Sequence, residues 1–124
     1  MKNILVIGLG LIGGSIAKSL NKTEFNVFGM DTNSKTIEKA ISDKAIAQKC
    51  NHIEEFLAHN DDGIIVFATS PSTVVKIIES NRKILNTNFS ITDVSSSKLN
   101  ISKFLNFVFF ITSPIPSHFI IIKA

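Results

Sequence analysis

The feature that most constrains this chain is a glycine-rich turn that directly follows a short apolar run near the N-terminus. Residues 4–7 (Ile-Leu-Val-Ile) are apolar and mostly branched, as expected for a parallel strand buried on both faces. Gly8, Gly10 and Gly13 come next, and the apolar positions then change to helical spacing as far as Leu20. This order predicts the first unit of a sheet in which strands and helices alternate.

The same alternation continues along the chain. Further strands are expected at residues 25–30, 64–68, 89–94 and 107–111, and residues 45–50 are an ambiguous candidate for a short third strand. Helices are expected from residue 11 to 20, from a cap at Asn33 or Ser34 to Ser42, and over residues 53–57, 71–85 and 97–105. The pattern predicts an α/β fold of the Rossmann type, a doubly wound parallel sheet of about six strands in a single domain.

Length and composition exclude several other classes of protein. A chain of 124 residues has room for one core, so we expect the domain to span residues 1–112 and residues 113–124 to form a divergent tail. The net charge is only +3 and the lysines are scattered among acidic residues, which argues against nucleic acid as a partner. No apolar segment is long enough to span a membrane. Cys50 has no cysteine to pair with, and His52 and His59 lack metal-ligand spacing. We therefore expect a cytoplasmic protein without a metal.

The spacing of the glycines fits the chemistry of a dinucleotide. A diphosphate needs unobstructed backbone amides at the positive end of a helix dipole. Gly8 permits the tight turn, Gly10 lets the backbone approach the phosphates, and Gly13 lets the helix pack closely on the strand. The amides of Leu11 and Ile12, at the start of the helix, complete the expected phosphate site.

The second expected strand ends at Asp31, near the position where dinucleotide-binding domains carry an acid. A carboxylate there accepts hydrogen bonds from the adenosine ribose and repels a 2′-phosphate, so we expect NAD in preference to NADP. Lys35, close behind, would weaken this preference. The alternative is that Asp31 only caps a helix or holds a loop.

Three motifs together resemble the N-terminal domain of the prephenate and arogenate dehydrogenase family. They are residues 8–15 (Gly-Leu-Gly-Leu-Ile-Gly-Gly-Ser) with Asp31, residues 67–71 (Phe-Ala-Thr-Ser-Pro) and residues 93–98 (Asp-Val-Ser-Ser-Ser-Lys). The resemblance covers nearly the whole chain, although the family typically has glycine where this chain has Ser95. It implies that Thr69, Ser70 and Pro71 also contact the cofactor.

The resemblance further implies NAD-dependent oxidative decarboxylation of prephenate to 4-hydroxyphenylpyruvate, a step of tyrosine biosynthesis. In this family a histidine takes the hydroxyl proton of the small-molecule substrate and a serine orients it, and a helical second domain forms the homodimer. By motif, these residues are Ser96 and His118. After His118, residues 119–124 stand where the family has Pro-x-Ala-Gly, and we expect the family's second domain to be absent. We therefore expect a truncated or interrupted gene product, read out of frame at its end, that binds cofactor without turnover.

Several alternatives stay open. Ser96 can act simply as a helix cap, and His118 can be an inert solvated residue near the terminus. A non-enzymatic NAD-sensing module would need the glycine turn and Asp31 alone. The chain can also be the first domain of another hydroxyacid or imine dehydrogenase, although residues 93–98 argue against this. The sequence does not distinguish prephenate from arogenate.

Overall fold

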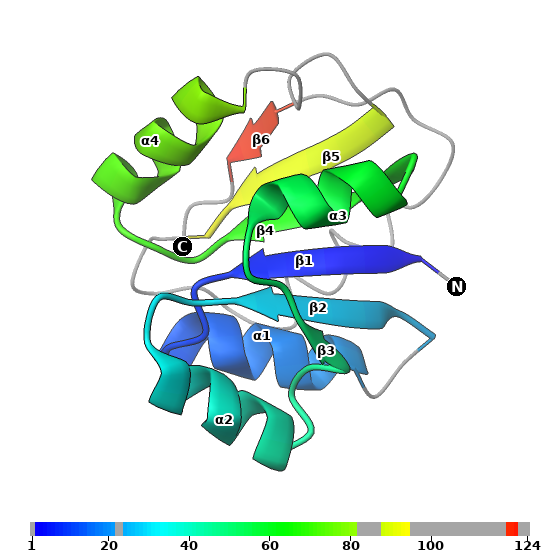
Figure 1. Cartoon of the computed structure of the whole chain (residues 1–124), viewed down its shortest axis with the longest axis vertical. Helices are drawn as coiled ribbons and strands as arrows, with labels where there is room; N and C mark the ends of the chain where they lie inside the picture. Colours follow the sequence, from blue (N-terminus) through cyan, green and yellow to red (C-terminus); the bar gives the residue numbers. More distant parts are fainter. Residues whose placement is uncertain (1, 22–23, 82–87, 95–118, 122–124) are drawn as a thin grey trace.

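The computed structural model describes residues 2–21, 24–81, 88–94 and 119–121, and the structural statements below concern these residues (Figure 1). They form one parallel sheet with the strand order β3-β2-β1-β4-β5-β6. The strands are β1 (Asn3–Ile7), β2 (Asn26–Met30), β3 (Gln48–Lys49), β4 (Asp62–Phe67), β5 (Asn88–Asp93) and β6 (Phe119–Ile121). The helices are α1 (Leu11–Asn21), α2 (Ser34–Ser42), α3 (Ile53–His59) and α4 (Pro71–Ser80).

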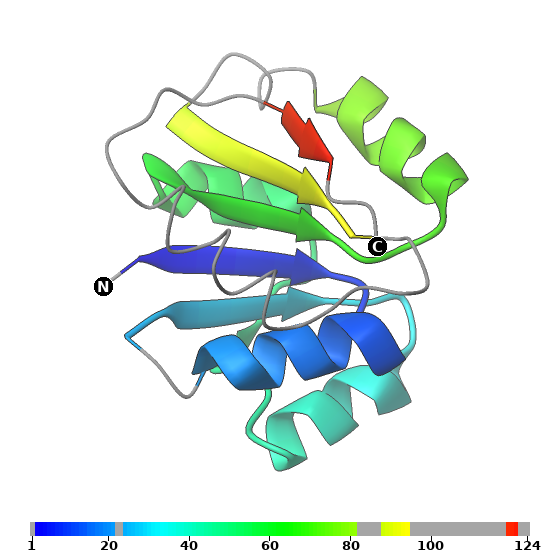
Figure 2. The same ribbon diagram turned by 180° about the vertical axis from the view of Figure 1, so that it is seen from behind.

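The order of the strands and the positions of the helices confirm the predicted doubly wound α/β fold. From the central strand β1, the chain first builds outward through β2 and β3 and then crosses over to β4 on the other side of β1. Helices α1 and α2 cover one face of the sheet, and α3 and α4 cover the other (Figures 1 and 2). The reversal of direction places a topological switch point at the carboxyl ends of β1 and β4, where such folds bind ligands.

The packing of β1 on both faces of the sheet explains why residues 4–7 are all apolar. Ile4 and Val6 pack with α1 and α2, whereas Leu5 and Ile7 pack with α3 and α4. All four side chains are at most 2% exposed. A central parallel strand has no solvent face, so every position is apolar.

The ends of several elements differ from those expected. The ambiguous third strand has only two residues, and α3 continues to His59. Helix α4 ends at Ser80, where the backbone of Asn81 leaves the helical conformation and its amide bonds Ile78 O at 3.2 Å. The expected helix at 97–105 and the expected strand at 107–111 lie outside the described residues.

The sixth strand that the structure describes lies near the C-terminus. Phe119–Ile121, in the stretch expected to form a tail, runs parallel to β5, and Ile91 is the register partner of Phe119.

Within the described part of the chain, no helix is both long and apolar enough to cross a membrane.

Candidate functional site

The glycine turn lies between the end of β1 and the start of α1, as the sequence predicts. Gly8 has a φ of +97°, a conformation that side chains other than glycine's rarely adopt. A Cβ atom at this position would also lie 2.5 Å from Ala68 O, in the loop after β4. The amide of Gly8 donates to Met30 O at 2.8 Å, which joins the turn to the end of β2. Both the turn and its neighbours therefore require glycine here.

The other two glycines of the motif have different surroundings. A Cβ atom on Gly13 would lie 1.8 Å from Gly8 O, so α1 packs too closely on the turn for any side chain. A Cβ atom on Gly10 would meet nothing within 4 Å. Packing within the described residues therefore accounts for Gly13 and leaves Gly10 unexplained. The open space above Gly10, at the amino end of a helix, fits a phosphate that must come close to the backbone.

The first turn of α1 leaves its positive end free for such a group. It contains no acidic residue, and Leu11 is 90% exposed beside the turn. Ile12 is half-buried and packs against the α1 and α2 side of the core. Ser15 is occupied locally, since its hydroxyl donates to Leu11 O at 2.7 Å. The backbone amides at the start of the helix are the groups that remain to bind an anion.

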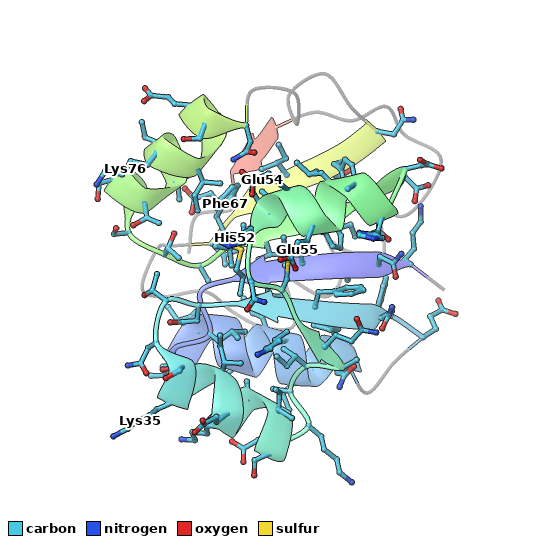
Figure 3. All side chains as sticks on the ribbon, in the orientation of Figure 1. Lys35, His52, Glu54, Glu55, Phe67 and Lys76 are labelled. Atoms are coloured by element: carbon cyan, nitrogen blue, oxygen red, sulfur yellow. The ribbon has the colours of Figure 1, made fainter. Side chains whose placement is uncertain are left out.

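Asp31 lies beside the glycine turn, directly after β2. Its Oδ2 accepts a hydrogen bond from the Leu9 amide at 2.9 Å, and its Oδ1 accepts one from the Asn33 amide at 2.8 Å. The cap of α2 is Asn33, whose Oδ1 accepts from the amides of Lys35 and Thr36. A carboxylate has about four acceptor positions, so each oxygen of Asp31 keeps one that the amides of Leu9 and Asn33 do not use. Lys35 is exposed and extends away from the body of the molecule (Figure 3).

The loop after β4 lies next to the turn. The amide of Ala68 donates to Ile7 O at 2.8 Å. Thr69 Oγ1 is buried and has no hydrogen-bond partner among the described residues, an arrangement that normally calls for an explanation. Ser70 is the N-cap of α4, accepting from the Thr73 amide at 3.4 Å, and Pro71 is at the start of that helix. Ser70 therefore has a structural role at the start of α4, whereas no described residue pairs with the hydroxyl of Thr69.

Sequence reasoning missed a groove that begins at Gly10 and runs between α1 and α2. It has a volume of about 430 Å³, and Lys18, Thr36 and Lys39 are among its polar lining residues. No local motif marks these residues, because the groove arises only when the two helices pack side by side. The expected catalytic residues Ser96 and His118 lie outside the described residues.

Comparison with known proteins agrees with this geometry. Residues 3–106 match the family model described as the NAD binding domain of 6-phosphogluconate dehydrogenase. The prephenate dehydrogenase of Lactococcus lactis subsp. cremoris is 31% identical in an alignment of 112 residues that covers 88% of this chain. This chain spans only 30% of the length of that relative.

Solved structures show the same relationship. A prephenate dehydrogenase from A. aeolicus, in complex with hydroxyphenyl propionate and NAD+, superposes with a TM-score of 0.61 at 26% identity, covering 75% of this chain and 33% of that one. An imine reductase from Bacillus cereus superposes with a TM-score of 0.64 over 99% of this chain and 55% of its own, but at 15% identity it supports the fold alone. These findings confirm the resemblance to prephenate dehydrogenases and the expectation of NAD as cofactor.

Proposed function

We propose, from the premise that this chain belongs to the family of NAD-binding domains described for 6-phosphogluconate dehydrogenase, that it is the NAD-binding part of a prephenate or arogenate dehydrogenase. The observation that carries the proposal is the open space above Gly10, at the amino end of α1 and beside the carboxylate of Asp31. Packing among the described residues leaves this glycine unexplained, whereas a bound diphosphate explains it.

Different residues bind different parts of the cofactor in this proposal. The amides at the start of α1 hold the diphosphate, because they are unpaired donors at the positive end of the helix. The free acceptor positions of Asp31 hold the adenosine ribose, and its charge disfavours a 2′-phosphate, so NAD is preferred to NADP. The hydroxyl of Thr69, which has no partner among the described residues, is a further candidate contact for the cofactor. When bound, NAD supplies the hydride acceptor.

The substrate and the catalytic residues belong to the same proposal. A substrate of the prephenate class would lose a hydride and carbon dioxide, with Ser96 orienting its hydroxyl and His118 accepting the proton. Imidazole suits that role because its ordinary pKa is close to neutral. Hydride transfer requires both reactants in near-attack geometry. The described residues offer groups for the cofactor, and we propose that this chain binds NAD without turning over prephenate by itself.

Calorimetric titration with NAD+ and with NADP+ tests the cofactor site directly. We expect saturable binding of NAD+, weaker binding of NADP+, and binding of NAD+ that is about 10- to 100-fold weaker in Gly10→Ala. A wild-type chain that binds neither dinucleotide would contradict the proposal. Incubation with prephenate and NAD+ tests the second part: we expect no formation of NADH, and formation at ordinary enzymatic rates would show that this chain carries a complete active site.

A further inference from the structure

A second cavity lies on the other face of the sheet and at the opposite ends of the strands. It has a volume of about 530 Å³ and is lined by the amino ends of β1 and β2, by β3 and by α3. In Figure 1, α3 lies in front of β4, and no described helix lies in front of β2. The cavity is therefore the part of this face that the helices leave uncovered. It is separated from the glycine turn by the length of β1, because the turn follows the carboxyl end of that strand.

One wall of the cavity is a row of three asparagines from different parts of the chain. Asn26 Nδ2 donates to Asn3 Oδ1 at 3.0 Å, Asn3 Nδ2 donates to Asn60 Oδ1, and Asn60 Nδ2 donates to Phe56 O at 2.8 Å. Asn3 and Asn26 are register partners on β1 and β2. Each bond fixes the orientation of the next amide. Every Nδ2 keeps a second hydrogen, and Asn26 Oδ1 has no partner among the described residues.

A second wall is aromatic. Phe28 on β2 meets Phe56 on α3 edge to face, with ring centroids 5.4 Å apart and an interplanar angle of 72°. Phe56 is only 2% exposed, whereas Phe28 is half-buried and has ring surface left for the cavity. A flat apolar surface beside a row of amides is suited to a flat ligand that stacks on the ring and bonds through its edge.

The charges at the rim do not favour an ion. Lys49 on β3 and Glu55 on α3 both line the cavity and are exposed, so their formal charges balance. Glu55 lies on α3 in Figure 3, and His59, one turn later, already bonds Glu55 O through Nδ1 at 2.8 Å. The thiol of Cys50 is likewise engaged, since its Sγ donates to His52 O at 3.0 Å.

We propose that this cavity is a second ligand site, which binds a small uncharged aromatic amide or nucleobase. The ring stacks on Phe28, and an edge carrying both a donor and an acceptor bonds the amides of Asn26 and Asn3. The amides are suited to such an edge because they present donors and acceptors alternately. The site does not depend on the proposed cofactor site, because the two share no residue.

The test uses benzamide as the probe and amide NMR of the full chain as the measurement. We expect saturable shifts of the side-chain amides of Asn3, Asn26 and Asn60, with a dissociation constant of about 1 mM, reasonable for so small a ligand. Cyclohexanecarboxamide, which keeps the amide but not the ring, and benzoate, which keeps the ring but is charged, should each bind at least fivefold more weakly.

Variants locate the site. Asn26→Ala should weaken the binding of benzamide at least fivefold. The matched control Asn81→Ala, at the end of α4 and outside the cavity, should leave the affinity for benzamide unchanged. The proposal is overturned if no asparagine side chain shifts, if the two variants behave alike, or if the three probes bind equally to the wild type. This last comparison needs no variant, so it decides the matter even where Asn26→Ala fails to fold.

Discussion

Alanine in place of Gly10 and of Gly13 should have opposite effects, although the two residues lie in one turn. A Cβ atom on Gly10 meets nothing within 4 Å, and its φ is outside the left-handed region. Gly→Ala at such a position usually stabilises a protein by about 0.4–1 kcal/mol, because it restricts the unfolded chain. Gly10→Ala should therefore be at least as stable as the wild type.

Gly13→Ala should lower the free energy of unfolding. Its Cβ atom would lie 1.8 Å from Gly8 O and 3.0 Å from the Ala68 Cβ, so α1 must move away from the turn. Overpacking of this kind costs about 1–3 kcal/mol or more. This is a large part of the roughly 5–15 kcal/mol that stabilises a typical domain.

The two variants should also separate folding from binding. In Gly10→Ala the new methyl group occupies the space assigned to the diphosphate and prevents close approach to the backbone amides. Hydrogen bonds to charged groups contribute about 1.5–3 kcal/mol each. The loss of one such bond should therefore weaken the binding of NAD+ by about 10- to 100-fold. Urea denaturation measures the stability, and calorimetry measures the affinity.

Two results would refute this reasoning. If Gly10→Ala binds NAD+ as tightly as the wild type, the phosphates do not lie over the glycine turn. If Gly13→Ala unfolds at the same urea concentration as the wild type, the close contact between α1 and the turn does not constrain the fold.

Three further predictions concern single side chains. Asp31→Ala removes the acceptor of the Leu9 amide as well as the proposed ribose ligand, so calorimetry should show weaker binding of both NAD+ and NADP+. Asp31→Asn should chiefly reduce the ratio of the NAD+ affinity to the NADP+ affinity. Asn33→Ala removes the N-cap of α2 and should lower the free energy of unfolding by about 1 kcal/mol in urea; an unchanged midpoint would contradict the capping role. Burial raises the pKa of the Cys50 thiol above 9.0, so the unfolded chain loses this proton at a lower pH than the folded chain does. The free energy of unfolding should therefore fall as the pH rises above about 9. Cys50→Ala should show a smaller fall between pH 8 and pH 10, and an equal fall would exclude the thiol as its cause.

The parts of the fold that sequence predicted are those with a local signature. The apolar run of β1, the three glycines and Asp31 lie within one strand-helix-strand unit, and their spacing alone indicates what they do. The two-residue β3 was ambiguous because so short an edge strand leaves almost no pattern. The resemblance implies a cofactor contact for Ser70, which stays a prediction, and the coordinates add that its side chain caps α4.

Long-range arrangements were beyond sequence reasoning for a different reason. Asn3, Asn26 and Asn60 are unremarkable in sequence, and their side chains meet because β1 pairs with β2 while α3 ends nearby. Polar side chains at the amino ends of strands carry no periodic signal. The groove between α1 and α2 likewise depends on how two helices pack, which the apolar spacing of each helix does not specify.

The central position of β1 also sets the order in which the molecule can assemble. Ile4 pairs with Val27 on one side and with Ile64 on the other, so the sheet cannot close around its first strand until β4 has been synthesised. Pairings between residues so far apart are slow to form. On a ribosome, the glycine turn therefore gains its contact with the loop at Ala68 only after β4 has been made.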